Sequence, residues 1–298
     1  MNPIYEKILA QIISGVAYGS IYGIFALSIV FLYRVNRLFN LASTEIATFF
    51  VICMYFLMKH MSYLLAFALT IILAFIGGCS LHFGLMRVVT ERKNVLHSNE
   101  TVITIGVFTI LNSLSSFLFS DEAQKFPSPL PERVLNFWGV NVALNTLAIL
   151  GFAVLIALAL LFILRLLPIG LLMEATSENI VNARLRGIKV SNILALAWGV
   201  ATAISVTAAV LIAPALFLSP GMLRQVFSYA LIAVAIGGLE SPFGAVVGGV
   251  LIGIVENLST NFEVFGSELK FLAVFCLLLV MLIVKPRGLW GREEHRRV

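Results

Sequence analysis

The chain has 298 residues, of which 60% are hydrophobic and 12% charged, and its mean hydropathy is +1.02. Soluble domains carry about 25% charged residues, so this composition excludes an ordinary soluble enzyme and indicates an integral membrane protein. The net charge of +5 does not indicate a nucleic-acid partner, because the charges lie at the ends of apolar runs, next to membrane lipid. No long polar stretch interrupts these runs, so we expect one transmembrane domain over 1–298, without a cleaved signal peptide.

Apolar runs long enough to cross a bilayer recur along the chain. A transmembrane helix needs about 20 mostly apolar residues. The sequence predicts helices over 9–33, 41–58, 62–86, 101–119, 141–164 and 192–213, a broken region over 226–258, and a last helix over 270–284. We therefore expect an all-α polytopic bundle of about 8 or 9 membrane helices.

Small residues are spaced regularly in the first helix. Gly15, Gly19 and Gly23 recur at every fourth position, where each would cost a soluble helix about 1 kcal/mol relative to alanine. In lipid this spacing lets two helix backbones approach closely. We expect two such close-packing faces. The second is formed by Gly244, Gly248, Gly249 and Gly253. Alternatively, one of the two faces could line the transport path.

The region 226–258 is interrupted by "GGLESPFGA" at 237–245. Non-helical backbone cannot face lipid, so the interruption must be buried in protein or line a wet cavity. We predict two short helices, 226–238 and 243–258, that meet at a turn. Gly237, Gly238 and Glu240 in this turn are candidates for a gate, and Glu240 could instead clamp the turn.

Lys and Arg residues gather in a few connecting segments. They lie in 34–37, 87–93, 165–191 and the tail from Lys285, which the positive-inside rule assigns to the cytoplasm. The N-terminus and a polar, Pro-rich loop over 120–140 are then outside. A single long helix over 226–258 would reverse the membrane orientation of the N-terminal half and place Arg34 and Arg37 outside. The positive-inside rule therefore favours the broken pair.

The start of the second helix reads "NLASTE". Its Glu45 is stabilised by the helix dipole and has either an interfacial structural role or a role in a gate or substrate contact. Few other acids lie within the spans, which disfavours an ion-coupled carrier, and Glu256 is expected near the outer surface. The cysteines are expected to be buried, and the scattered histidines indicate neither a metal site nor another cofactor. The other pathway candidates are Asn40, Ser43, Thr104 and Gly106.

The longest polar interruption is 167–192. Residues from Met173 to Leu185 alternate as in a short amphipathic helix, and Gly187 is well placed to end it. This segment is either a solvated connector or a helix that docks a soluble partner. The residues on which docking would depend are Glu174, Ala175, Glu178, Asn179, Ala183, Arg184, Leu185 and Gly187.

Several motifs occur together in one order. They are "GSIYGIFALSIVFLYRV", "TIG" at 104–106, "FPSP" at 126–129, "EATSENIVNARLRGIKV", "GGLESPFGAVVGG" and "KPRGLWG". In this order they resemble the permease subunits of bacterial ABC importers of the branched-chain amino acid type. The resemblance implies a type II-like fold in the inner membrane, two permeases of the same or related sequence, and an extracytoplasmic substrate-binding protein. It also implies separate ATPase subunits, docked on 173–188, because the chain has no nucleotide-binding loop.

Two positions depart from this family. The chain has "NLASTE" where the family has "NFAHGE", and Glu174 where the family usually has arginine. The expected solute is a small polar compound such as a branched-chain amino acid or urea. The alternatives are an ATP-independent channel or secondary transporter, and the permease of a sugar-type ABC importer.

Overall fold

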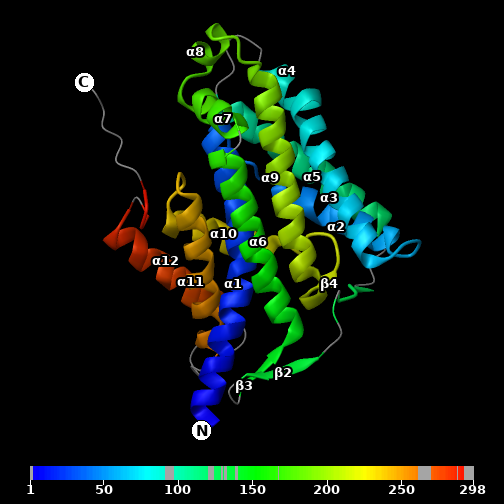
Figure 1. Cartoon of the computed structure of the whole chain (residues 1–298), viewed down its shortest axis with the longest axis vertical. Coiled ribbons are helices and arrows are strands. Elements are labelled where there is room, and N and C mark those ends of the chain that lie inside the picture. The colour runs from blue at the N-terminus through cyan, green and yellow to red at the C-terminus, as the bar shows by residue number, and fades with distance from the viewer. Residues whose placement is uncertain are drawn as a thin grey trace. The chain divides into compact units, whose positions relative to one another are not determined.

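The computed structural model describes residues 3–90, 97–119, 124–128, 130, 133–137, 140–166, 168–260, 270–286 and 288–291. Helices dominate this part of the chain (Figure 1). Five described helices are long and apolar enough to cross a membrane, and four shorter apolar helices accompany them. The expectation of an all-α polytopic protein is therefore confirmed.

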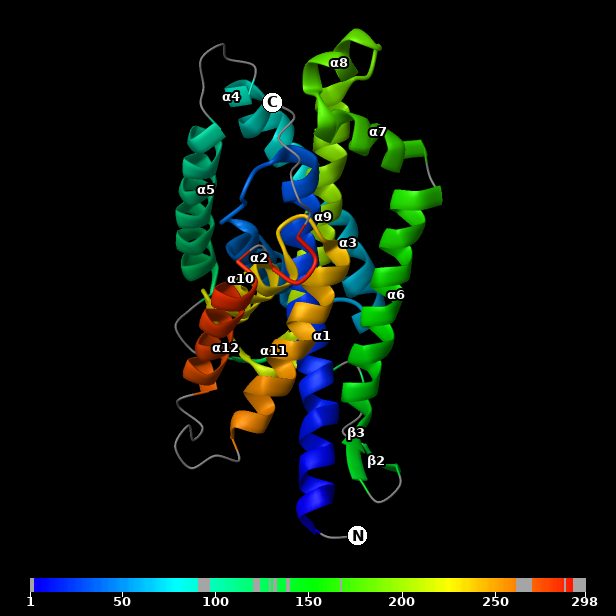
Figure 2. The same ribbon diagram turned by 90° about the vertical axis from the view of Figure 1, so that its left-hand side faces the viewer.

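The structure divides into two compact units. Unit 1 comprises 1–30, 128–154 and 226–298, and unit 2 comprises 31–127 and 155–225. Two helices, α1 (Pro3–Asn36) and α6 (Leu144–Leu166), divide substantially between the units, and a third, α10 (Arg224–Gly237), has its first two residues in unit 2. The same ribbon turned by 90° in Figure 2 shows each unit from a second side.

Unit 1 contains a hairpin and three further helices. The hairpin consists of β2 (Val134–Phe137) and β3 (Val140–Ala143), with Val134 opposite Ala143. The helices are α10 (Arg224–Gly237), whose first two residues belong to unit 2, α11 (Pro242–Ser259) and α12 (Lys270–Val284). The predicted broken pair is thus present as α10 and α11.

Glycines bring α1 and α11 together in unit 1. A Cβ atom at Gly15 would lie 2.8 Å from the Gly253 carbonyl oxygen, and one at Gly253 would lie 2.4 Å from the Cα of Gly19. A Cβ at Gly249 would lie 2.3 Å from the backbone nitrogen of Gly23. The residue numbers rise on one helix as they fall on the other, so the helices run antiparallel with their backbones in contact.

The turn between α10 and α11 has its own hydrogen bonds. Gly238 has φ +102°, a conformation that favours glycine, and the Ser241 hydroxyl caps α11 by accepting from the Gly244 N–H at 3.0 Å. Carbonyl groups at the end of α10 accept from the C-terminal segment: Leu289 N–H donates to Ile236 O at 2.8 Å and Trp290 N–H to Gly237 O at 3.2 Å. Backbone polar groups of the break thus have hydrogen-bond partners both within the turn and in the C-terminal segment.

Unit 2 is built on a pair of long helices, α3 (Tyr63–Leu81) and α9 (Val190–Ile212), which lie side by side (Figure 1). A Cβ atom at Gly78 would lie 2.6 Å from the Trp198 carbonyl oxygen, and the Cys79 thiol lies 3.3 Å from the Ala195 carbonyl oxygen. One turn of π-helix, His82–Met86, extends α3 toward the short α4 (Arg87–Thr90).

Two further helices of unit 2 are α2 (Ser43–Leu57) and α5 (His97–Leu118). They pack through an apolar cluster of Ala42, Ile46 and Val107. The segment expected as an outer loop contains β1 (Gln124–Lys125), which pairs antiparallel with β4 (Phe217–Leu218). Tyr55 of α2 donates a hydrogen bond to Gln124, which ties this strand to unit 2.

The observed helix bounds agree with the predicted spans to within a few residues. Two local expectations were wrong. The cysteines are not fully buried: Cys276 is exposed on α12, and Cys53 and Cys79 are half-buried. The segment 173–188 is not one helix but two, α7 (Pro168–Glu178) and α8 (Ile180–Leu185), separated by Asn179.

Candidate functional site

A hydrogen-bonded turn precedes α2 and fixes its start. The Asn40 side-chain oxygen accepts from Ala42 N–H at 3.0 Å, and the Ser43 hydroxyl donates to the Asn40 carbonyl oxygen. Thr104 of α5 accepts from Leu41 N–H at 3.2 Å. The predicted pathway residues Asn40, Ser43 and Thr104 therefore lie together, and they tie the turn to α5.

Glu45 follows this turn on the first coil of α2. Its exposed fraction is 0%, and neither carboxylate oxygen has a hydrogen-bond partner of regular geometry among the described residues. It therefore accepts no N–H from its own helix end, and its role, interfacial or in a gate, stays a prediction. Burying an unpartnered carboxylate is costly, so this position is unusual in a structure whose other spans are largely apolar.

Two residues that the sequence did not single out lie on the adjacent helix. Asn112 of α5 interacts with the Glu45 carboxyl group, but among the described residues its Nδ2 atom forms no hydrogen bond of regular geometry, and neither does the buried hydroxyl of Ser115. Arg224, at the start of α10 and exposed to solvent, attracts the Glu45 carboxylate. Asn112 and Ser115 are three residues apart, so they lie on one face of α5. This spacing of two polar residues within an apolar span is visible in the sequence.

The remaining pathway candidates are located elsewhere. Gly237, Gly238 and Glu240 belong to the break in unit 1. Gly106 is on α5, but a Cβ atom there would meet nothing within 4 Å. Its lack of a side chain is therefore not required by any described neighbour.

A second carboxylate is Glu256, near the end of α11 in unit 1, which is half-buried and paired. Tyr22 of α1 donates a hydrogen bond to its Oε2 atom at 2.8 Å. The ring of Tyr22 lies 4.9 Å from that of Tyr229, centroid to centroid. The expected position of Glu256 near the outer surface stays a prediction.

The candidate docking segment is formed by α7 and α8. Asn179 ends α7 and caps α8, its side chain accepting from Asn182 N–H at 3.0 Å. Gly187 ends the segment with φ +80°, as the sequence predicts. Ala183 is 2% exposed and so packs inside the chain, whereas we expected it to face a partner.

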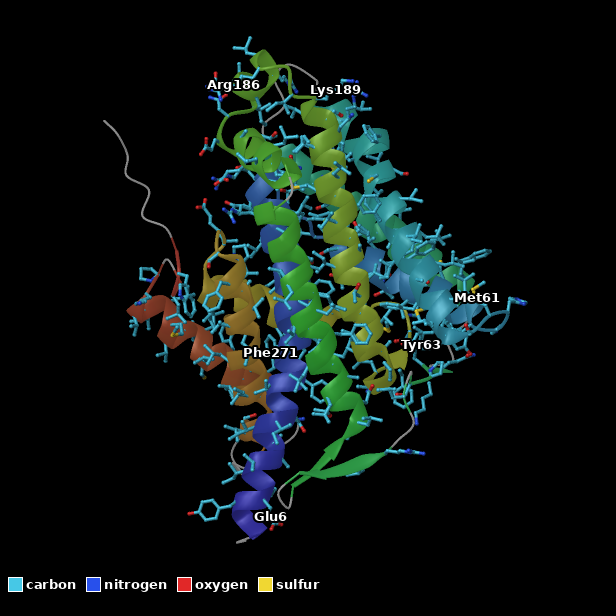
Figure 3. The ribbon with its side chains drawn as sticks, in the orientation of Figure 1. Glu6, Met61, Tyr63, Arg186, Lys189 and Phe271 are labelled. Carbon is cyan, nitrogen blue, oxygen red and sulfur yellow. The ribbon has the colours of Figure 1, made fainter. Side chains whose placement is uncertain are left out.

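Other side chains of α8 face outward. Val181 and Leu185 are 65% and 81% exposed, and Glu174, Glu178 and Arg184 are also exposed, with Ala175 half-buried. Arg186 and Lys189 lie at the same end of unit 2, between α8 and α9, whereas Met61 and Tyr63 lie toward the other end of α3 (Figure 3). This distribution of basic residues agrees with the predicted cytoplasmic side, although the sidedness stays a prediction.

Apolar spanning helices, a broken helix pair and an exposed segment between α6 and α9 define a multi-pass membrane permease. A family model described as the permease component of branched-chain amino acid transport systems matches residues 11–284. The chain therefore belongs to this permease family.

Curated relatives match over their whole length. The chain is 26% identical over 315 residues to the high-affinity branched-chain amino acid transport system permease protein BraD of Pseudomonas aeruginosa, covering 100% of both chains. It is 27% identical over 313 residues to the LivH permease protein of Salmonella typhimurium, again covering 100% of both. Among solved structures, PsaBC from Streptococcus pneumoniae in complex with Fab is 13% identical, with 97% and 94% coverage and a TM-score of 0.43, a likeness too weak to carry an argument.

Proposed function

We propose that this permease of an ABC importer carries a branched-chain or closely related amino acid across the bacterial inner membrane. Its full-length relatives, which are branched-chain amino acid permease proteins by name, support the solute class. ATP hydrolysis is supplied by separate ATPase subunits, and the solute is delivered by an extracytoplasmic binding protein. A second permease, identical or related, completes the pathway.

The observation that carries the coupling role is the exposed apolar pair on α8. Val181 and Leu185 face outward from α8, and the buried Ala183 packs this helix against the rest of the chain. Exposed apolar side chains on a polar segment are more stable when they pack in a groove of another protein than when they contact water. The α7–α8 segment is therefore the docking element for the ATPase.

Val181→Asp tests this role. An aspartate there would place an unpaired charge in the contact, which costs several kcal/mol, so the ATPase should no longer copurify and ATP-driven L-leucine uptake in proteoliposomes should be lost. Val134→Asp is the matched control, because Val134 is similarly exposed, 62% against 65%, but lies on the β2–β3 hairpin. Leucine uptake that persists without any ATPase would favour the channel alternative instead.

A further inference from the structure

Buried polar atoms lie on α2 and α5, which pack together in unit 2. Both oxygens of Glu45, Nδ2 of Asn112 and the Ser115 hydroxyl are buried and have no hydrogen-bond partner of regular geometry among the described residues, although the Asn112 side chain interacts with the Glu45 carboxyl group. Nearly all buried polar groups in native proteins have a partner, and an exception requires an explanation. Here the exceptions include a carboxylate that is 0% exposed.

The position of these groups makes the exception more costly. Asn112 lies 11 residues after Thr101 and 6 before Leu118, the ends of the apolar span of α5. At a rise of about 1.5 Å per residue, it is roughly 16 Å and 9 Å from the two ends. A polar side chain at such depth is costly, and the carboxyl group of Glu45, with which Asn112 interacts, is of the type that usually marks substrate or ion pathways.

The chemistry of the three side chains is complementary to one kind of solute. The Glu45 carboxylate only accepts hydrogen bonds and carries negative charge, so it suits an ammonium group. The Asn112 amide nitrogen donates, so it suits a carboxylate, and the Ser115 hydroxyl can do either. An α-amino acid presents an ammonium and a carboxylate group on the same carbon atom.

We propose that Glu45 and Asn112 form a recognition site for the ammonium and carboxylate groups of a zwitterionic amino acid inside the membrane domain, with Ser115 as an auxiliary contact. This inference rests on the proposed function and assigns its substrate contacts. In the state described here the site is closed, because Glu45 has no exposed surface.

Opening the site requires α5 to move away from α2. The outward face of α5 is free of the described part of the chain, since Ile110 and Phe117 are 67% and 84% exposed. The contact that must separate is the small apolar cluster of Ala42, Ile46 and Val107 together with its half-buried neighbours. The α2–α5 contact is therefore the part of unit 2 that opens to admit the solute.

Glu45→Gln is the deciding variant. Glutamine keeps the shape and hydrogen-bonding capacity of a protonated glutamic acid but cannot carry charge. If Glu45 binds the ammonium group, ATP-driven uptake of radiolabelled L-leucine should fall at least tenfold, while the melting temperature of the purified permease stays the same or rises. Retained uptake would show that Glu45 is a neutral structural group and would overturn the site.

Thr44→Val is the matched control. Thr44 is adjacent in sequence, 1% exposed, and its hydroxyl also lacks a partner. At about 100° per residue it lies on the side of α2 opposite Ala42 and Ile46, which contact α5. Thr44→Val should keep leucine uptake near the wild-type rate, and a loss equal to that of Glu45→Gln would contradict the assignment to the α5 side.

A second variant and a photocrosslinking probe test the site independently of Glu45→Gln. If Glu45→Gln does not fold, Asn112→Leu replaces it and should lower uptake to a similar extent. Photo-leucine bound to the wild-type complex should crosslink to α2 or α5 peptides, and crosslinks confined to other helices would overturn the site. A wild-type complex with no ATP-driven leucine uptake would instead refute the proposed function, so the two failures are distinguishable.

Discussion

The two units bury their carboxylates in opposite ways. In unit 1, Glu256 accepts a hydrogen bond from Tyr22 at 2.8 Å. In unit 2, Glu45 is more deeply buried and accepts none of regular geometry from the described residues. A partnered buried acid contributes to the structure, whereas an unpartnered one costs stability. Proteins break such local rules chiefly at functional sites, so the difference agrees with our proposal that the solute binds at Glu45 in unit 2, whereas the Tyr22–Glu256 pair stabilises unit 1.

The α1–α11 contact of unit 1 also differs from the surroundings of α5 in unit 2. The helices α1 and α11 meet backbone to backbone, with no room for a single carbon atom at Gly249. On α5, a Cβ atom at Gly106 would meet no described atom within 4 Å. The α1–α11 contact therefore tolerates little change at its glycines, while α5 has space around Gly106.

The largest effect is expected from Gly249→Leu. Its Cβ would lie 2.3 Å from the Gly23 nitrogen and 2.4 Å from the Gly23 Cα, so α1 and α11 would have to separate. The cost exceeds the about 1–3 kcal/mol of ordinary overpacking. We expect no monodisperse protein after detergent extraction, measured by size-exclusion chromatography. Gly106→Leu is the control and should extract normally; a normal profile for Gly249→Leu would show that the contact can relax.

An intermediate effect is expected from Tyr22→Phe. The change removes the hydroxyl that donates to Glu256 and leaves a half-buried acceptor without this partner, a loss of about 1–3 kcal/mol in unfolding free energy. The melting temperature of the purified permease should fall. Tyr5→Phe, at a tyrosine that is 70% exposed, should leave it unchanged. If both variants melt alike, the Tyr22–Glu256 pair does not stabilise unit 1.

The smallest effect is expected from Ser241→Ala, which removes the N-cap of α11. Loss of such a cap costs about 1 kcal/mol, and the melting temperature should fall slightly. Ser177→Ala is the comparison in unit 2, because the Ser177 hydroxyl bonds only to the Glu174 carbonyl oxygen in an exposed position. A larger drop for Ser177→Ala would reverse the ranking of the two units.

Much of the fold could be predicted because lipid imposes simple rules. Spans of sufficient length are visible as apolar runs, and the break at 237–245 is visible as a cluster of glycines with a proline. The candidate site could be predicted only in part. Glu45 stood out as a charged residue at the end of a span, but its neighbour Asn112 on α5 depends on how the turn at 40–43 is tied to Thr104, which no local pattern encodes.

The docking segment shows a second limit of sequence reasoning. Its amphipathic pattern runs on from Met173 to Leu185 and suggests one helix. Asn179 interrupts that helix because its side chain competes for the backbone N–H of Asn182. The interruption turns Ala183 inward and Leu185 outward, a reversal that depends on tertiary contacts and not on periodicity.

The hydrogen bonds from Leu289 and Trp290 to the end of α10 have a consequence for biosynthesis. Translation produces α10 some 50 residues before these donors, so the Ile236 and Gly237 carbonyl groups lack their final partners until the last part of the chain leaves the ribosome. The broken helix pair can therefore enter the membrane early but is completed last. In a nascent chain stopped before Leu289, the Ile236 and Gly237 carbonyl groups would lack these two hydrogen bonds. This difference distinguishes the incomplete chain from the full-length permease.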